Sequence, residues 1–138
     1  MRPVLVDTGF LVSIYDNHEP RHGVCLRIHA ALPNPLVTCQ AVVAESLHLL
    51  GRIPEAADGI LASVEAGILQ VPLQLQPSAG TVRTILRKYL DTPADFADAC
   101  LIHMADELNT GDILTLDSDF KHYRWRRTRH FRMLIPID

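Results

Sequence analysis

Several signatures of common enzyme and scaffold classes are missing from this sequence. The chain has three cysteines and no CxxC pair, which argues against a disulfide scaffold and favours a reducing compartment. It contains no GxSxG elbow, no glycine-rich phosphate loop, and no apolar run near the about 18 residues that a membrane-spanning helix needs. The amino terminus is too short and too quickly charged for a signal peptide. We therefore expect a cytoplasmic protein without a membrane segment.

One segment matches the sequence of a zinc-protease motif but not the helical context that the motif needs. The run His18-Glu19-Pro20-Arg21-His22 matches HExxH, which binds zinc when both histidines lie on one face of a continuous helix. Pro20 would break such a helix, and the segment is polar. We interpret it as a loop.

The charge distribution divides the chain into an acidic body and one basic segment. The formal net charge is −3. Residues 121–132, the basic segment, hold six of the thirteen lysines and arginines and no acid, which leaves seven basic against sixteen acidic residues elsewhere, a net of −9. Such a segment attracts phosphate backbones, although a solvated surface strip would have the same composition. We predict RNA contacts at Arg124, Arg126, Arg127 and Arg129.

Length and patterning predict one α/β domain over residues 1–138. A chain of 138 residues has the commonest size of a single domain, and its 48% hydrophobic residues are enough to fill a core. Strands that alternate with helices indicate a mainly parallel sheet with helices on both faces, a three-layer, Rossmann-like α/β/α sandwich. We expect strands at 3–7, 36–38, 68–75, 112–116 and 131–137, and helices at 8–15, 21–31, 39–50, 55–66, 78–89 and 93–108.

Three local signals refine these boundaries. Thr38 is placed to cap the helix that begins at residue 39, and Thr92 followed by Pro93 is placed to begin the helix that ends near residue 108. Pro72 restricts its strand to a sheet edge, because proline has no amide hydrogen for pairing.

Acidic residues follow two of the predicted strands. Asp7 ends the run Val4-Leu5-Val6, and Asp117 follows the run 113–116. The carboxyl ends of parallel strands meet at the crevice where such folds bind ligands, so we expect both side chains there. A helix cap would explain Asp7 equally well on local grounds, and Asp119 is interpreted as a turn residue.

Two helical segments add further carboxylates. Glu45 has Ala41 and Leu49 as helical neighbours, and a carboxylate on a mainly apolar stripe needs a partner or a metal unless it reaches water at the helix border. Asp95 and Asp98 are three residues apart and project from one helix face. Asp95 also suits a capping box, whereas Asp98 opens an apolar run and has a weaker local explanation.

Together these acids predict a metal-dependent phosphodiesterase. Carboxylates that share one crevice repel each other unless a hard cation neutralises them, which favours Mg²⁺ or Mn²⁺. We expect Asp7, Asp98 and Asp117 to bind one or two ions, with Asp95 as a further metal ligand. Glu45 would act as a ligand or position the attacking water.

The motifs in their order resemble a known family. VDTGFL, then AES in a helix, then DFADACLIHMA and LTLDSDF are similar to a PIN domain, in particular to the VapC-like toxins of bacterial toxin–antitoxin pairs. The resemblance covers nearly the whole chain and implies an α/β/α sandwich with Mg²⁺- or Mn²⁺-dependent endoribonuclease activity. It also implies an RNA substrate, a homodimer, and an antitoxin whose tail enters the acidic crevice.

The resemblance assigns roles to matching positions. The acid that ends the first strand is Asp7, the helical glutamate is Glu45, the acid before the apolar helix is Asp98, and the acid of LTLDSDF is Asp117. Asp95 is the extra acid of a DxxD form. The basic segment is richer in arginine than the resemblance implies.

Two other functions stay open at this stage. The fold could serve as an RNA-binding or regulatory module with weak or no catalysis, whose phosphate binding would persist in EDTA and fall with salt. A phosphatase or a DNA-directed nuclease would use similar metal chemistry, so the choice of RNA depends on the resemblance alone.

Overall fold

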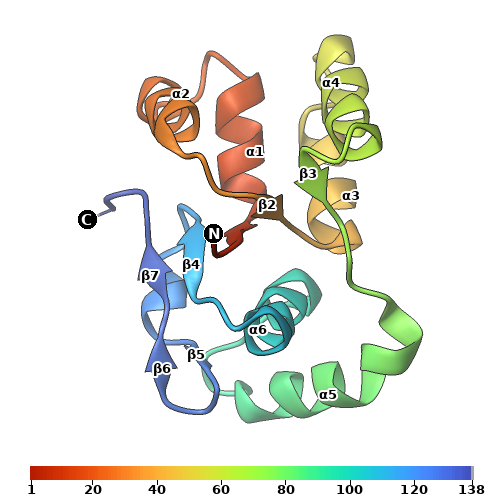
Figure 1. Cartoon of the computed structure of the whole chain (residues 1–138), viewed down its shortest axis with the longest axis vertical. Helices are drawn as coiled ribbons and strands as arrows, with labels where there is room; N and C mark the ends of the chain where they lie inside the picture. Colours follow the sequence, from red (N-terminus) through yellow and green to blue (C-terminus); the bar gives the residue numbers. More distant parts are fainter. Residues whose placement is uncertain (138) are drawn as a thin grey trace.

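The computed structural model of the protein describes residues 1–137 and has a five-stranded sheet at its centre (Figure 1). Every pairing is parallel, in the order β3-β2-β1-β4-β7. The central strand pairs on both sides, since Leu5 lies opposite Val37 and Ile113. The strands are β1 (Val4–Val6), β2 (Leu36–Val37), β3 (Leu69–Gln70), β4 (Asp112–Leu114) and β7 (Arg132–Met133).

Six helices surround this sheet. In Figure 1, α1 and α2 lie on one side of the strands, α5 and α6 on the other, and α3 and α4 stand beside the β2–β3 edge. The central β1 is buried on both faces, which explains its unbroken apolar run. The helices are α1 (Thr8–Tyr15), α2 (His22–Ala31), α3 (Gln40–Leu49), α4 (Pro54–Glu65), α5 (Leu75–Lys88) and α6 (Phe96–Leu108).

The predicted α/β/α sandwich is therefore confirmed. Helix α1 has the predicted bounds, and β3 lies at a sheet edge as Pro72 indicated. The strands are shorter than predicted, and α5 begins at Leu75 rather than Ser78. Among residues 1–137, no helix is both long and apolar enough to cross a membrane. The three cysteines are buried and free, as expected.

Two predicted helix caps are wrong. The Thr38 hydroxyl donates to the Val6 carbonyl oxygen at 2.6 Å, which ties β2 to β1, and α3 begins after Cys39 without a side-chain cap. Helix α6 begins three residues later than predicted, with Asp95 as its N-cap. A reciprocal capping box with Asp98 satisfies more of the free amide groups of the first turn than Thr92 could.

The basic segment folds into a hairpin, which the sequence patterns did not predict. Strands β5 (Arg124–Trp125) and β6 (Arg129–His130) pair antiparallel after the short 3₁₀ helix η1 (Ser118–Lys121). Trp125 anchors the hairpin, being 6% exposed, and its indole nitrogen donates to the His130 carbonyl oxygen at 3.1 Å. The indole packs so closely on Gly111 that a Cβ there would overlap it. The interpretation of this segment as a merely solvated strip is therefore wrong for Trp125.

Candidate metal centre

Asp7 lies between β1 and α1 and serves both elements. Its backbone amide donates to the Leu114 carbonyl oxygen at 3.0 Å, so the strand pairing with β4 fixes its position. One carboxylate oxygen caps α1 through the Thr8 amide at 2.8 Å, and the other accepts the Thr115 hydroxyl at 2.7 Å. Asp7 is thus a helix cap and a crevice acid at once, and the two alternatives from the sequence are both realised.

Asp98 is held by the first turn of α6. Its amide donates to Asp95 Oδ1 at 2.8 Å, and its own Oδ2 accepts the Asp95 amide at 3.1 Å. Asp98 is 8% exposed, whereas Asp95 is exposed. The capping box therefore directs Asp98 inward and leaves Asp95 at the surface.

Asp117 reaches the same place from the turn after β4. It caps η1, with Oδ1 accepting the Asp119 amide at 2.9 Å. The buried Thr115 hydroxyl connects it to Asp7, because this hydroxyl accepts the Asp117 amide at 3.0 Å while donating to Asp7. Thr115 was not identified from the sequence. Its position two residues before Asp117, on the same side of an extended chain, was the available signal.

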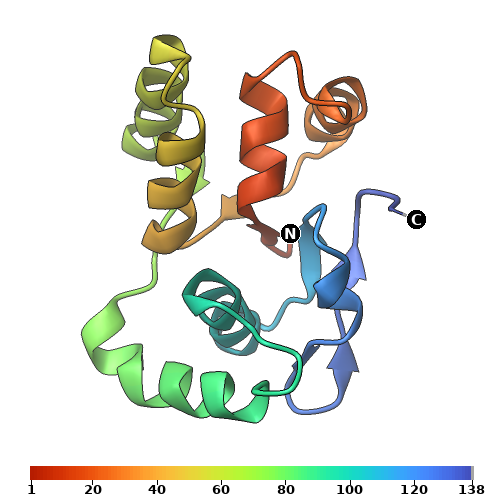
Figure 2. The same ribbon diagram turned by 180° about the vertical axis from the view of Figure 1, so that it is seen from behind.

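The three acids form one cluster. Carboxylate oxygens of Asp7, Asp98 and Asp117 all lie within 4.8 Å of one another. They line a cleft of about 400 Å³. The lining residues come from the first turns of α1 and α6, from α3 and from the chain after β4, elements whose ribbons Figure 2 shows from behind. The topology therefore brings together residues separated by more than a hundred positions in the chain.

The electrostatics of the cluster are unfavourable without a cation. Burial and the neighbouring carboxylates Asp95 and Asp7 raise the pKa of Asp98 from an ordinary 3.8 to about 7. Burial, together with Asp117 and Asp95, also raises the pKa of Asp7, although hydrogen bonds from Thr115 and Thr8 oppose the shift. Within residues 1–137, no arginine, lysine or histidine forms an ion pair with the cluster.

The donor set fits a hard divalent ion. The cluster offers only carboxylate oxygens, which Mg²⁺ and Mn²⁺ prefer, and no described sulfur or imidazole belongs to it. The Thr8 hydroxyl, also on the cleft, is buried without a hydrogen-bond partner in the described chain. A hydrated ion bound here would neutralise the three acids, and one of its water molecules would give the Thr8 hydroxyl a hydrogen-bond partner.

The remaining predicted acids lie at the mouth of the cleft. Glu45 and Asp95 line it but do not belong to the three-acid cluster. Glu45 is exposed, so the prediction that it lies on an apolar stripe is wrong. The buried residues of α3 are Val42 and Ser46, and Glu45 stands beside that stripe.

Glu19 is an acid of the cleft that the sequence did not reveal. It lines the cleft from the turn between α1 and α2. The loop interpretation of the HExxH letters is confirmed, because residues 16–21 form no helix. No periodic pattern surrounds Glu19, so only the position of the loop could have identified it.

Comparisons with known proteins agree with this fold. A model of the PIN domain family matches residues 4–126, and the chain therefore belongs to the PIN domain family. Ribonuclease VapC26 of Mycobacterium tuberculosis is 29% identical over 136 residues, which cover 97% of this chain and 93% of that protein. The crystal structure of the VapC20 toxin of the same organism, which cleaves the sarcin–ricin loop, matches with a TM-score of 0.80 at 22% identity. The match covers 91% of this chain and 98% of that one.

Proposed function

We propose that the protein is a metal-dependent endoribonuclease of the VapC type. The observation that supports this most is the cluster of Asp7, Asp98 and Asp117, three carboxylates within 4.8 Å of one another with no basic partner among the described residues. The ribonuclease named among the relatives aligns over nearly the whole chain, so the same chemistry is expected here.

The chain's own residues divide the work at this site. Asp7, Asp98 and Asp117 would hold Mg²⁺ or Mn²⁺, which supplies a lowered water pKa and neutralises charge on the phosphate oxygens. Glu45 and Asp95 at the cleft mouth can accept hydrogen bonds from an attacking water and orient it toward the phosphate. Thr115 and the helix caps keep the cluster rigid, so that little reorganisation is needed during the reaction.

A cleavage assay tests the proposal directly. Purified protein is incubated with a panel of fluorophore–quencher RNAs in Mn²⁺, Mg²⁺ or EDTA. We expect cleavage with either metal, products with 5′-phosphate and 3′-hydroxyl ends, and no cleavage in EDTA. RNA binding without cleavage under every metal would contradict the proposal and favour the RNA-binding or regulatory module.

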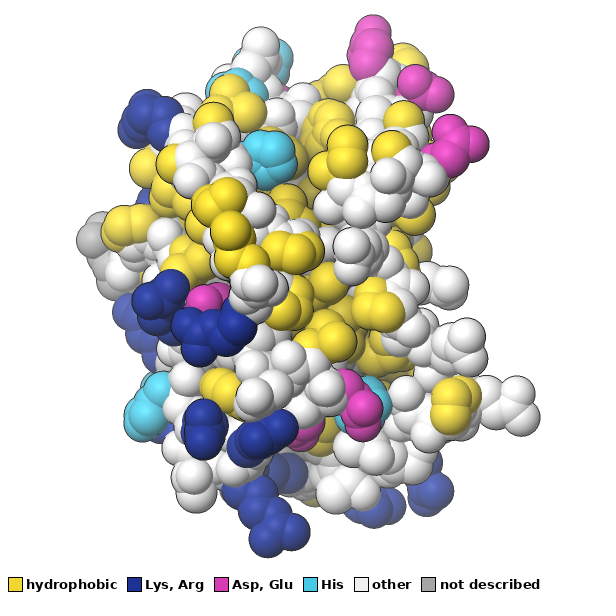
Figure 3. Space-filling view, in the orientation of Figure 1, with side chains coloured by type: hydrophobic (Ala, Val, Ile, Leu, Met, Phe, Trp, Pro, Cys, Tyr) yellow, Lys and Arg dark blue, Asp and Glu magenta, His cyan; other side chains and the backbone are white. Residues whose placement is uncertain are grey.

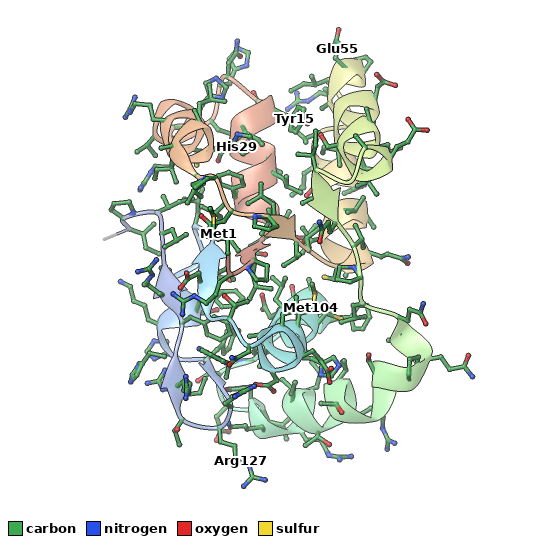
Figure 4. The ribbon with its side chains drawn as sticks, viewed as in Figure 1. Met1, Tyr15, His29, Glu55, Met104 and Arg127 are labelled. Atoms are coloured by element: carbon green, nitrogen blue, oxygen red, sulfur yellow. The ribbon has the colours of Figure 1, made fainter. Side chains whose placement is uncertain are left out.

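The hairpin β5–β6 is the surface that we propose for the RNA backbone. Basic side chains gather at the lower end of the molecule, and acidic ones lie over α4 at the other end (Figure 3). Arg127 projects outward at the hairpin tip (Figure 4). Arg126, Arg127 and Arg129 are exposed and form no ion pair within the described chain. Arg124 instead donates to backbone carbonyl oxygens, including that of Lys121 at 2.9 Å.

The backbone at the tip supports a role for these charges. Arg126 and Arg127 adopt φ angles of 45° and 69°, in the left-handed region that favours glycine or asparagine. Each such residue costs about 1 kcal/mol or more, which a turn built with glycine would avoid. None of the three arginines forms an ion pair in the described fold, but Arg126 and Arg129 lie over the Trp125 ring, 5.9 and 5.2 Å from its centroid, and so help to hold the hairpin. Arg127 has neither kind of contact among the described residues, so its charge is the one that phosphate binding explains best.

Neutralising the tip should weaken RNA binding without changing the metal site. For the triple variant Arg126→Gln, Arg127→Gln, Arg129→Gln, we expect weaker binding at low salt. The slope of log affinity against log salt should become shallower by roughly 2, because each phosphate that the protein neutralises on a single strand contributes about 0.7 to this slope. Filter binding in EDTA over a salt series measures both, with Arg27→Gln on α2 as the control. An unchanged slope would show that the hairpin does not contact the RNA phosphates.

The partner proteins follow from the same proposal. The three clustered acids have no basic side chain beside them among the described residues, so they would attract an arginine or lysine from an antitoxin tail. That side chain would silence the enzyme by occupying the metal site. The action as a toxin and the predicted homodimer belong to this proposal as well. Co-expression with the product of a neighbouring reading frame, followed by size-exclusion chromatography with light scattering, would test both associations.

A further inference from the structure

Tyr123 is a buried side chain that contacts the acid cluster and has no role in the site described so far. It is 0% exposed and is one of the largest fully buried side chains in the described chain. Its hydroxyl lies 3.3 Å from Asp98 Oδ2 and 3.3 Å from the Pro93 carbonyl oxygen. A core position of this kind would ordinarily take phenylalanine, because a buried hydroxyl needs a partner to offset its lost hydration.

Packing of the ring fixes the position of this hydroxyl oxygen. The Tyr123 ring stands edge-on to Tyr89 and to Phe120, each with ring centroids 5.0 Å apart, and Phe120 packs edge-on to Phe131 at 5.2 Å. Burial and the nearby carboxylates also raise the pKa of Tyr123. Because aromatic neighbours enclose the ring, the hydroxyl oxygen stays within reach of Asp98 Oδ2 and of the Pro93 carbonyl oxygen, the two acceptors for its hydrogen.

The contact adds a second hydrogen bond to one of the two carboxylate oxygens of Asp98. Oδ2 receives the Asp95 amide at 3.1 Å and the Tyr123 hydroxyl, which leaves Oδ1 without a hydrogen bond to the described chain. We propose that Tyr123 is a positioning residue that holds Asp98 with Oδ1 toward the metal site and thereby sets the affinity of the cluster for a divalent ion. This inference depends on the proposed metal-dependent function. Partners behind a ligand typically contribute about 10- to 100-fold in metal affinity or activity.

The chain offers a matched control in Tyr89. Its ring packs against Tyr123, and its hydroxyl accepts the Arg124 amide at 2.9 Å. It contacts none of the three clustered acids through any hydrogen bond in the described residues. Tyr89→Phe and Tyr123→Phe therefore each remove one hydroxyl from the same aromatic group, and only the second removes a contact to Asp98.

Mn²⁺ binding measured by isothermal titration calorimetry tests the inference without depending on activity. We expect Tyr123→Phe to bind Mn²⁺ about tenfold more weakly than the unmodified protein, and Tyr89→Phe to bind within about twofold. In cleavage assays, Tyr123→Phe should lose kcat at low Mn²⁺, recover most of it at saturating Mn²⁺, and keep its KM for RNA. A general packing defect would lower kcat at every Mn²⁺ concentration.

The outcomes separate this inference from the proposed function. Equal Mn²⁺ affinity in Tyr123→Phe and the unmodified protein would overturn the positioning role, as would an equal loss in Tyr89→Phe. If the unmodified protein bound no Mn²⁺, or Asp98→Asn bound it normally, the metal centre itself would be wrong and the inference would fail with it. Thermal melts of both tyrosine variants establish that the titrated proteins are folded.

Discussion

Asp98→Asn and Asp7→Asn should each lose RNA cleavage by more than about a hundredfold. Each change removes one of three charges that would hold the divalent ion, and the loss of one preorganised electrostatic group typically costs about 10² to 10³ in rate. The effect should appear in kcat rather than in the KM for RNA, since the proposed contacts to the RNA backbone lie on the hairpin β5–β6, apart from the metal site. Single-turnover cleavage with saturating Mn²⁺ measures the chemical step directly.

The fold should survive both substitutions. An asparagine at position 98 retains an amide oxygen that accepts the Asp95 amide and the Tyr123 hydroxyl in place of Oδ2. An asparagine at position 7 can still cap α1 through the Thr8 amide, and the Thr115 hydroxyl can rotate to accept from the new NH₂ group. Circular dichroism spectra should therefore match that of the unmodified protein, and both variants should melt in one cooperative transition.

Asp119→Asn is the matched control for these variants. Asp119 lies two residues from Asp117 and donates its backbone amide to it, but its carboxylate is outside the cluster. We expect cleavage within about threefold of the unmodified rate, because the substitution keeps the backbone contact. Near-normal cleavage by Asp98→Asn or Asp7→Asn would refute the assignment of the site.

The predictable part of the fold and site follows from strand geometry. A parallel sheet brings the ends of its strands to one edge, so an acid directly after each apolar run was enough to place Asp7 and Asp117 together. Asp98 was favoured because it opens an apolar run and its local explanation looked weaker than that of Asp95. The structure gives it a local role as well, because its Oδ2 accepts the Asp95 amide in the capping box, and the same box directs it into the cluster.

The less predictable part depends on contacts between distant segments. Thr38 has the residue type of a cap, but it bonds to β1 because β2 lies beside that strand in the folded sheet. Tyr123 lies in a run dominated by arginine, and its contact with Asp98 spans 25 residues. The three-residue turn between β5 and β6 carries two arginines at positive φ, which turn propensities disfavour. Local patterns carry no information about such tertiary partners.

The free energy of unfolding of the metal-free protein should decrease as the pH rises from about 4 to about 7. The pKa of Asp98 is 3.8 in its ordinary state and about 7 in the fold. In this window the folded protein keeps a proton that the unfolded chain has released, so raising the pH favours unfolding. The loss of stability is partial at about pH 5 and complete above about pH 7.

Thermal melts in EDTA at pH 5 and pH 8 measure this effect, with Asp98→Asn as the comparison. Other groups titrate over the same range, so the informative quantity is the difference between the two proteins. We expect Asp98→Asn to have the higher Tm at pH 8, by several degrees, and the gap to narrow at pH 5. Parallel pH profiles for the two proteins would show that Asp98 does not carry the shifted proton.

Mn²⁺ should reverse the order of stability at pH 8. The ion binds the deprotonated carboxylates, and a ligand at about a hundred times its Kd stabilises the folded state by about 2.7 kcal/mol. The unmodified protein should therefore gain Tm on adding Mn²⁺, more at pH 8 than at pH 5, while Asp98→Asn gains little. An equal gain in both proteins would place the bound ion elsewhere. The expected reversal would mean that the buried charge of Asp98 destabilises the metal-free fold and also gives the site its affinity for the ion. Such a trade of stability for function is expected where repelling acids form an active site.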